Sequence, residues 1–346
     1  MSKVLVTGGA GYIGSVLVKD LIQEGYDVRV FDKFIFGKES LTGLENRIEM
    51  VQGDIRDFKP EILDKVSYII HLAGFSNDPM AFYNPEANNQ INTSGTRKLA
   101  EEASKSGIKR FTYASSASIY DKGLRGSNEL QTEKSGVEPK APYSISKYEG
   151  ERELLKVMEN NPDFSPVILR QGTIYGHSPR MRFDLVVNTF AKEAFKTGRL
   201  KVFCGGTQWR PLVDIKDVAR AHIECLKAPE EKVKGEIFNV VQDNYQVWDI
   251  AHRTKWALKG IVNVDIDIDY QDDRVDRSYR ISGEKLGEVL GFKYKRGVEE
   301  SIRDIAMKIK EGVYGENLDN PSFNNIEWIK LLTEMKKKLD GIGNVF

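Results

Sequence analysis

The first thirty residues alternate between short apolar runs and polar or glycine-rich breaks. Residues 3–7 form an apolar run rich in β-branched residues, which stops at Gly8. From Ser15 to Ile22 apolar residues recur at helical spacing, and a second β-branched run begins at Asp27 and ends at Asp32. Because apolar spacing and glycine breaks mark local structure, this pattern predicts a strand, a tight turn, a helix and a second strand.

The turn has the glycine spacing of a dinucleotide-binding site. Gly8 allows a sharp turn, Gly11 lets the backbone approach a pyrophosphate, and Gly14 lets the helix pack close to the sheet. Asp32 stands where an acid can accept hydrogen bonds from the adenosine ribose and repel a 2′-phosphate, which favours NAD over NADP. The alternative is a glycine-rich turn without a ligand. The complete strand, turn and helix context favours dinucleotide binding.

Strand-like and helix-like segments continue to alternate up to about residue 170. Strands are predicted at 47–53, 66–74, 109–116 and 165–170, and helices at 60–65, 91–106 and 143–160. Alternation of this kind gives a parallel sheet with helices on both faces, whose ligands lie beyond the carboxyl ends of the strands. We therefore expect an α/β fold with a Rossmann-type, doubly wound parallel sheet, in which residues 1–170 form the NAD-binding domain.

The pattern changes in the second half of the chain. A helix is predicted near 185–197, and a strand within 235–245 is expected to return to the main sheet. The remainder of 171–346 is expected to form a smaller C-terminal α/β lobe that binds the substrate.

Composition gives no reason to expect nucleic acid or a membrane as a partner. Lys and Arg together number 51, as do Asp and Glu, so no net charge favours nucleic acid or an anionic membrane. No apolar stretch reaches the length of a membrane span. Cys204 and Cys225 form neither a disulfide framework nor a zinc pattern, and no secretory apolar segment follows the first residue. We expect a cytoplasmic protein without a metal.

A tyrosine and a lysine on one predicted helix are the candidate acid–base pair. Tyr143 and Lys147 are four residues apart and share a helix face. A nearby ammonium is expected to lower the pKa of the Tyr143 phenol toward the working pH, and the Ser116 hydroxyl at a strand end is expected to share its proton. These groups suit hydride transfer at a secondary alcohol. The alternatives are a solvated helix face and a polar strand-end loop.

Together these segments resemble the extended short-chain dehydrogenase/reductase superfamily, in its NAD-dependent nucleotide-sugar epimerase/dehydratase branch, with UDP-glucose 4-epimerase as the model. The resemblance covers about Val4 to Leu290. It is carried by the segments 7–14, 53–57, 71–74, 91–96, 115–120, 142–147 and 209–219.

The resemblance implies a role for each matching residue. Tyr143 would be the acid–base, Lys147 would order the nicotinamide ribose, and Ser116 would contact the substrate. The implied cofactor-binding residues are Gly8, Gly11, Tyr12, Ile13, Gly14, Asp32, Asp54, Ile55, Leu72, Ala73, Gly74, Asn92, Tyr143 and Lys147. Asp54 and Ile55 would cover the adenine.

The implied partner is a nucleotide-diphosphate sugar. Arg210 would hold the diphosphate, because a guanidinium fork suits phosphate. Thr173 replaces the usual asparagine and would make a different sugar contact, and Arg182 or its neighbour Arg180 would touch phosphate or sugar. Arg274 would match the last diphosphate arginine. Asp78 would face the sugar as a hydroxyl acceptor, or merely cap a turn, and is left outside the catalytic set.

Departures from the family bear on the reaction. Related 4,6-dehydratases carry an Asp-Glu pair where this chain has Ala117 and Ser118, and related decarboxylases keep an acid at the second position. Oxidation and reduction at one sugar carbon, commonly C4, then remain. We expect an epimerase; a 4-dehydrogenase or 4-ketoreductase is the alternative, and a dehydratase or a non-catalytic NAD-binding regulator fits less well.

The resemblance also implies a homodimer. Its interface would use the helix that opens at Tyr143 and the helix that begins near Ile91. Leu154, Leu155 and Met158 permit such an interface but suit packing against the sheet equally well.

Overall fold

The computed structural model describes residues 2–108, 110–121, 129–263, 265–271 and 277–342. Its main sheet contains β1 (Lys3–Thr7), β2 (Asp27–Asp32), β3 (Ile48–Gln52), β4 (Val66–His71), β5 (Arg110–Ser116), β7 (Ser165–Gln171) and β11 (Ile237–Val240). All pairs are parallel, and the order is β11-β7-β5-β4-β1-β2-β3. The strand order reverses beside β1, which confirms the predicted Rossmann-type, doubly wound fold.

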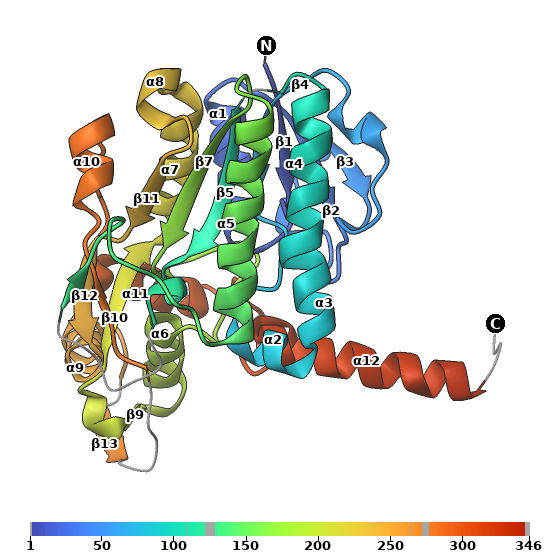
Figure 1. Ribbon diagram of the computed structural model, residues 1–346. Helices are drawn as coiled ribbons and strands as arrows, with labels where there is room; N and C mark the ends of the chain where they lie inside the picture. Colours follow the sequence, from blue (N-terminus) through green and yellow to red (C-terminus); the bar gives the residue numbers. More distant parts are fainter. Residues whose placement is uncertain (1, 109, 122–128, 264, 272–276, 343–346) are drawn as a thin grey trace.

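Helices cover both faces of this sheet (Figure 1). They include α1 (Tyr12–Gln23) and α7 (Ile215–Lys227), which pack together on one face, and α4 (Thr96–Lys105) and α5 (Pro142–Asn160), which pack together on the other. Strand β1 shows why both faces are covered. Val4 and Val6 belong to the buried cluster that contains α1, whereas Leu5 belongs to the cluster that contains α4. Successive side chains of a strand point to opposite faces, so an entirely apolar strand requires cover on both sides.

A second region lies beyond the carboxyl ends of the strands. It contains the strands β8 (Thr173–Tyr175), β9 (Arg199–Phe203), β10 (Trp209–Asp214), β12 (Asp243–Gln246) and β13 (Asp267–Gln271), and the helices α6 (Val186–Thr197), α9 (Val247–Ala257) and α11 (Val298–Lys310). Strands β12, β10 and β8 form one sheet, and β13 pairs with β9. Helix α6 confirms the helix predicted near 185–197.

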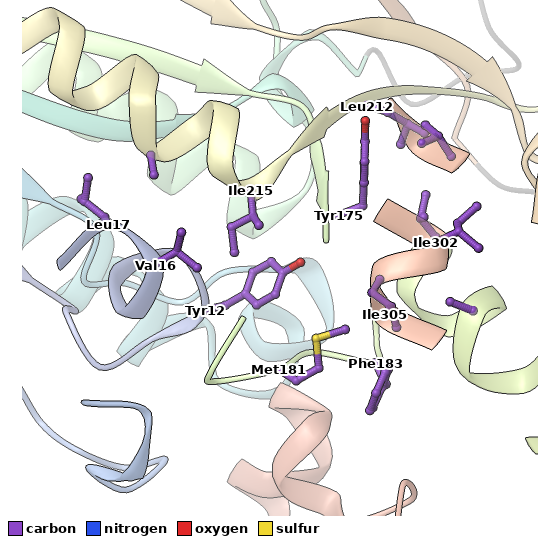
Figure 2. Packing of buried hydrophobic residues seen from close by; sticks show 14 of the residues in the cluster. Tyr12, Val16, Leu17, Tyr175, Met181, Phe183, Leu212, Ile215, Ile302 and Ile305 are labelled. Atoms are coloured by element: carbon purple, nitrogen blue, oxygen red, sulfur yellow. The ribbon is translucent and has the colours of Figure 1, made fainter. Parts of the chain in front are cut away.

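One hydrophobic core joins the two regions (Figure 2). Tyr12 and Val16 of α1 lie in the same buried cluster as Phe183 before α6 and Ile302 of α11. The chain also crosses between the regions several times, because α7 covers the main sheet and β11 forms its edge after the first strands of the second region. The division of the chain at residue 170 therefore stays a prediction.

The helix predicted at 91–106 begins with a wider turn. Segment η3 (Gln90–Gly95) has π-helical hydrogen bonding and precedes α4. A side chain at Gly95 would press on Ile55, since an added Cβ would lie 3.1 Å from its Cγ2. Wide turns of this kind are frequent at functional sites. The predicted strand 66–74 also ends earlier, at His71, and the following residues form a loop.

The remaining elements are short or lie at the periphery. They are η1 (Glu39–Leu41), η2 (Pro60–Leu63), α2 (Asp78–Tyr83), α3 (Pro85–Asn89), η4 (Ala117–Tyr120), β6 (Leu130–Gln131), η5 (Cys204–Gly206), α8 (Glu230–Val233), β14 (Arg280–Ile281), α10 (Glu284–Leu290), η6 (Pro321–Phe323) and α12 (Asn325–Ile342). Among the described helices, none combines the length and the apolar character that crossing a bilayer requires.

Candidate active site

A cavity of about 410 Å³ lies beyond the carboxyl ends of β1, β2, β4 and β5. This is the position expected for the ligand of a doubly wound sheet. The structure brings to its wall most of the residues selected from the sequence, namely Gly8, Gly11, Tyr12, Ile13, Gly14, Asp32, Asp54, Ile55, Leu72, Ala73, Gly74, Ser116, Tyr143, Lys147, Thr173 and Arg182.

The glycine turn leaves room for a ligand where side chains would block the backbone. Gly8 has a φ of +73°, and a Cβ on it would lie 2.8 Å from the backbone nitrogen of Ala73. A Cβ on Gly14 would lie 2.3 Å from the carbonyl oxygen of Gly8. Gly11 caps α1 without a side-chain hydrogen bond. The first N–H groups of the helix therefore keep their capacity to bind an anion.

Asp32 is oriented by the backbone around it. One carboxylate oxygen accepts the Ala10 N–H at 3.0 Å, and the other accepts the Phe34 N–H at 2.7 Å. Burial raises the pKa of Asp32, and these backbone N–H groups oppose that rise. Each oxygen has a further lone pair for a ribose hydroxyl.

Asp54 is held at the adjacent strand end by two cations. Its carboxylate lies 2.6 Å from the Arg56 guanidinium and 2.7 Å from the Lys33 ammonium. Hydrogen bonding to Arg56 is the largest cause of the lowered pKa of Asp54. Ile55 follows and lines the cavity beside it.

Asn92 supports the cavity from behind rather than lining it. Its side-chain oxygen accepts the Phe75 N–H at 2.8 Å, and its amide donates to the Phe75 carbonyl at 3.1 Å. This side chain is buried, and it fixes the loop that carries Leu72, Ala73 and Gly74. A direct cofactor contact by Asn92 stays a prediction.

The candidate acid–base group lies at the start of α5. Tyr143 and Lys147 line the same cavity as Ser116 at the end of β5. The Lys147 ammonium donates to the Ala114 carbonyl at 2.8 Å and lies 4.9 Å from the centre of the Tyr113 ring. These contacts point the ammonium toward the strand ends and not along the helix surface.

The pKa of the phenol differs from the prediction. Burial raises the pKa of Tyr143 to about 12, and a hydrogen bond with the Ser116 side chain opposes this rise. Burial also lowers the pKa of Lys147 to about 8, against the attraction of Glu151. The predicted net lowering of the pKa of Tyr143 toward the working pH is therefore wrong, because burial of the phenol dominates.

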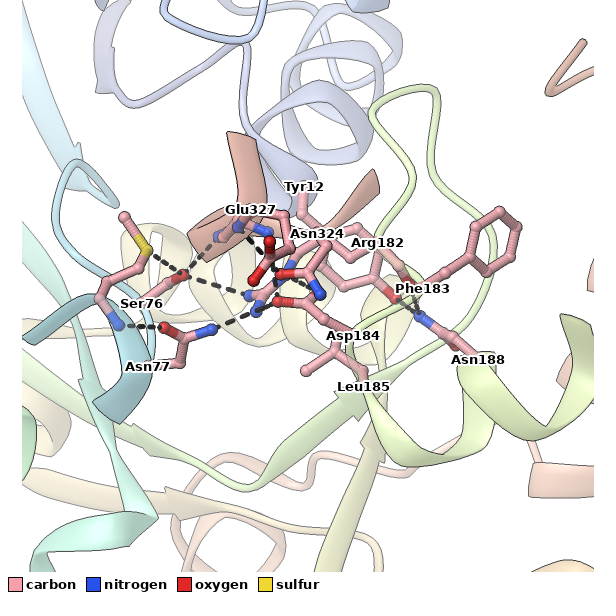
Figure 3. A network of polar contacts seen from close by, with 12 residues as sticks. Tyr12, Ser76, Asn77, Arg182, Phe183, Asp184, Leu185, Asn188, Asn324 and Glu327 are labelled. Carbon is pink, nitrogen blue, oxygen red and sulfur yellow. Dashed lines mark hydrogen bonds and ion pairs between the residues drawn. The ribbon is translucent and has the colours of Figure 1, made fainter. Parts of the chain in front are cut away.

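Arg182 lines the cavity and forms part of a polar network (Figure 3). Its guanidinium donates twice to the Asp184 carboxylate, at 2.8 Å each, and once to the Ser76 hydroxyl at 3.3 Å. The Asn77 amide donates to the same carboxylate at 3.3 Å. Arg182 is thus paired within the wall. Thr173 of β8 also lines the cavity.

One of the two remaining predicted arginines, Arg210, does not line the cavity among the described residues. It lies on β10 and donates to the backbone carbonyls of Trp209 and Arg277. Arg274 lies outside the described residues. Arg277, three residues further on, lines the cavity. The sequence indicated that the run from Asp273 to Arg280 holds the last diphosphate arginine. It did not determine which arginine of the run that is.

Arg180, which the sequence analysis named beside Arg182, lines the cavity together with residues from the last part of the chain. Arg180 lines the cavity with its guanidinium 3.7 Å from the centre of the Phe36 ring. Its guanidinium also donates at 2.5 Å to Asn325 Oδ1, at the start of α12. Asn325 and Tyr279 line the cavity from distant parts of the chain. Only the folded structure brings these segments to the glycine turn.

The glycine turn, the free N–H groups of α1 and the oriented carboxylate of Asp32 define a dinucleotide-binding Rossmann protein. Within that class, this chain belongs to the NAD dependent epimerase/dehydratase family, whose model matches residues 4–240. This match confirms the family predicted from the sequence and NAD as the cofactor.

Named relatives span nearly the whole chain. A putative UDP-glucose 4-epimerase of Methanocaldococcus jannaschii is 29% identical over 323 residues, which cover 89% of this chain and 98% of the relative. A UDP-N-acetyl-alpha-D-glucosaminuronate decarboxylase of Bacillus cytotoxicus is 28% identical over 321 residues, with 87% and 97% covered.

Solved structures superpose on nearly the whole chain. A UDP-glucose 4-epimerase of Thermotoga maritima, solved with UDP-glucose, superposes with a TM-score of 0.79 at 26% identity, covering 90% of this chain and 99% of the other. A UDP-N-acetylglucosamine 4-epimerase of Methanobrevibacter ruminantium superposes with a TM-score of 0.80 at 24% identity, covering 90% and 98%, and shows the fold alone.

Proposed function

We propose that this protein is an NAD-dependent nucleotide-sugar epimerase that acts at a sugar hydroxyl carbon, namely C4, as in relatives named 4-epimerases. The observation that carries the proposal is the meeting of Tyr143, Lys147 and Ser116 on the wall of the cavity that the glycine turn opens. Relatives named UDP-glucose 4-epimerase support the reaction class and the nucleotide-sugar substrate.

Each of the three side chains has a task in this chemistry. Tyr143 takes the hydroxyl proton as a general base and returns it as a general acid, and the Ser116 hydroxyl hydrogen-bonds the same oxygen. Lys147 supplies positive charge that favours the phenolate. The chemistry that bound NAD would supply is reversible hydride transfer at the sugar carbon. Inversion of the carbon would require that the cavity let the sugar present its other face.

The residues at the glycine turn and at the neighbouring strand ends suit the binding of NAD. The N–H groups at the start of α1 would bind its pyrophosphate, and Asp32 would bind the adenosine ribose. Asp54 and Ile55 would cover the adenine. Substrate contacts by Thr173 and the arginines Arg182, Arg210 and Arg274 remain predictions.

The proposal is tested without added cofactor. Pure protein is incubated with UDP-, dTDP-, GDP- and CDP-sugars, and the products are separated by chromatography. An epimer should form without added NAD, because the hydride removed from the sugar is returned to it. Net NADH, or a need for added NAD(P)H, would indicate the 4-dehydrogenase or 4-ketoreductase instead, and the absence of any product would contradict the proposal.

A single hydroxyl tests the catalytic assignment. Tyr143→Phe should lower kcat by about 10²- to 10⁴-fold, because a positioned acid–base contributes that much. Tyr83→Phe is the control, because Tyr83 is exposed on α2. Unchanged kcat in Tyr143→Phe would remove Tyr143 from the catalytic role.

We also propose that the protein is a cytoplasmic homodimer with a role in carbohydrate biosynthesis. Leu154, Leu155 and Met158 pack into the core beside the sheet, so an interface on α5 would use its outer face, which includes the exposed Ile145. Light scattering should give twice the chain mass of 39.2 kDa. A mass of one chain at micromolar concentration would contradict the dimer.

A further inference from the structure

An ion-pair cluster borders the cavity near Tyr143. Asp78, at the start of α2, lies 2.7 Å from the Arg277 guanidinium, which also lies 3.2 Å from the carboxylate of Asp121. Asp78 and Arg277 both line the cavity, as does the nearby Tyr279. Three separate segments of the chain therefore meet here.

One carboxylate oxygen of Asp78 accepts no hydrogen bond from the described residues. Its Oδ2 pairs with Arg277, whereas its Oδ1 is buried and has no hydrogen-bond partner in the described part of the chain. A buried acceptor without a donor is costly, so such atoms in native sites normally meet a donor. Asp78 is also close enough to Tyr143 for its charge to raise the pKa of the phenol.

The side chain of Asp78 does not cap helix α2. Asn77 caps α2, since its side-chain oxygen accepts the Met80 N–H at 3.1 Å. The side chain of Asp78 is 12% exposed and lines the cavity. Of the two alternatives for this residue, the hydroxyl acceptor is the one that its position favours.

The charge of the cluster bears on which sugars fit. The carboxylates of Asp78 and Asp121 both lie within ion-pair distance of the Arg277 guanidinium. The guanidinium of Arg182, which also lines the cavity, is paired with Asp184. A sugar that carries a carboxylate would meet like charge at this corner, and like charges in a partly buried site repel strongly.

We propose that Asp78 is a specificity-determining residue, which accepts a hydrogen bond from a neutral sugar and disfavours sugars that carry a carboxylate. This inference rests on the proposed function and refines its substrate class. The expected substrates are nucleotide sugars with a hydroxyl donor at the Asp78 side of the ring, and nucleotide-linked uronic acids are expected to be poor substrates.

The experiment compares two sugars that differ only at C6. The full-length protein with its NAD is given UDP-glucose or UDP-glucuronic acid, or the same sugar pair on the nucleobase that gives the highest turnover. Turnover is followed by chromatography, and binding is measured separately by calorimetry. Wild type should favour the neutral sugar by about 10-fold or more in kcat/KM and in affinity, as expected for a buried like charge.

Two variants separate the charge of Asp78 from its acceptor. Asp78→Asn removes the charge, so the discrimination between the two sugars should shrink at least about fivefold, chiefly through better use of the uronic acid. Asp78→Ala removes the acceptor, so KM for the neutral sugar should rise by about 10-fold while kcat changes less. Asp163→Asn, at an exposed loop position, is the matched control.

The outcomes distinguish this inference from the proposed function. Equal affinity and turnover of both sugars in wild type would overturn the inference and leave the epimerase standing. A preference of the wild-type epimerase for the uronic acid would also overturn the inference and leave the epimerase standing. If no sugar is converted, the proposed function fails, and calorimetry still decides whether Asp78 discriminates between the two ligands. Unchanged discrimination in a folded Asp78→Asn would also overturn the inference, and thermal unfolding verifies the fold.

Discussion

At the scale of single residues, the environment of Lys147 determines the pKa of its ammonium. Burial lowers its pKa to about 8, although the Glu151 carboxylate attracts its charge. The Arg170 guanidinium pairs with Glu151 at 2.7 Å, and this pairing weakens that attraction. Lys147 is therefore charged at neutral pH and loses its proton within the range that enzyme assays cover.

This gives a prediction for the pH profile. Activity should fall as the pH rises through about 8, because the lysine loses the positive charge that stabilises the Tyr143 phenolate. Lys147→Arg should move this descending limb to higher pH, since a guanidinium keeps its proton. The measurement is kcat against pH for both proteins. Identical descending limbs would show that another group titrates.

A second prediction at this scale concerns the glycine turn. Gly14→Ala should weaken NAD binding at least about 10-fold or destabilise the fold by about 1–3 kcal/mol, because overpacking forces the backbone apart. The added Cβ would lie 2.3 Å from the Gly8 carbonyl oxygen. Gly136→Ala is the control, because nothing lies within 4 Å of its added Cβ. Cofactor titration and thermal unfolding measure the two effects, and wild-type values for Gly14→Ala would refute this account of the turn.

At the scale of elements, the first turn of α12 joins segments on two sides of the cavity. The Asn325 amide donates to the Ser76 hydroxyl at 2.7 Å, and its oxygen accepts from Arg180. The Trp328 indole donates to the Ile35 carbonyl at 2.5 Å. The rest of α12 extends away from the body of the protein (Figure 1). Only the start of this helix therefore supports the cavity wall.

Truncation separates the two parts of α12. A chain that stops after residue 320 should bind NAD about 10-fold more weakly, because it loses several hydrogen bonds that fix the wall. A chain that stops after residue 331 keeps Asn325 and Trp328 and should bind NAD as the full chain does. Fluorescence titration measures both affinities. Equal affinity in the two truncated chains would contradict a role for this turn.

Elements with strong local patterns could be predicted from the sequence, and contacts between distant segments could not. The spacing of apolar residues predicts the strand before Gly8 and the helix near 185–197. The short strand β8 was not predicted, because three residues carry no periodicity. Asn325 reaches the cavity from far along the chain, and no motif marks it. The pKa of Tyr143 depends on burial, which spacing along a helix does not reveal.

At the scale of the whole molecule, two buried histidines tie strands of the sheet to helices. His71 lies between the Thr7 hydroxyl at 2.6 Å and the Thr96 hydroxyl at 2.9 Å. His222 of α7 lies 2.8 Å from the Thr112 hydroxyl. Burial lowers the pKa of each imidazole to about 3. Both are therefore neutral in the folded protein at any pH near 7.

These histidines predict a loss of stability in acid. The unfolded chain takes up a proton near pH 6.5 while folded His222 resists it until about pH 3, so stability falls as the pH drops through this window. Each such histidine contributes about 1.4 kcal/mol per pH unit. His222→Gln should reduce the slope of unfolding free energy against pH by this amount.

Denaturant unfolding between pH 4 and 6.5 measures that slope, in buffers of equal ionic strength. His252→Gln is the matched control, because His252 is exposed on α9. An unchanged slope in His222→Gln would show that other groups cause the acid sensitivity.

The position of β11 at the edge of the main sheet has a consequence for synthesis of the chain on the ribosome. Its partner β7 emerges first and keeps an open edge until Ile237–Val240 follows, after much of the second region has been made. Open strand edges attract other chains. A nascent chain that pauses between these two strands is therefore exposed to misassembly, and a stop codon there should yield insoluble fragments.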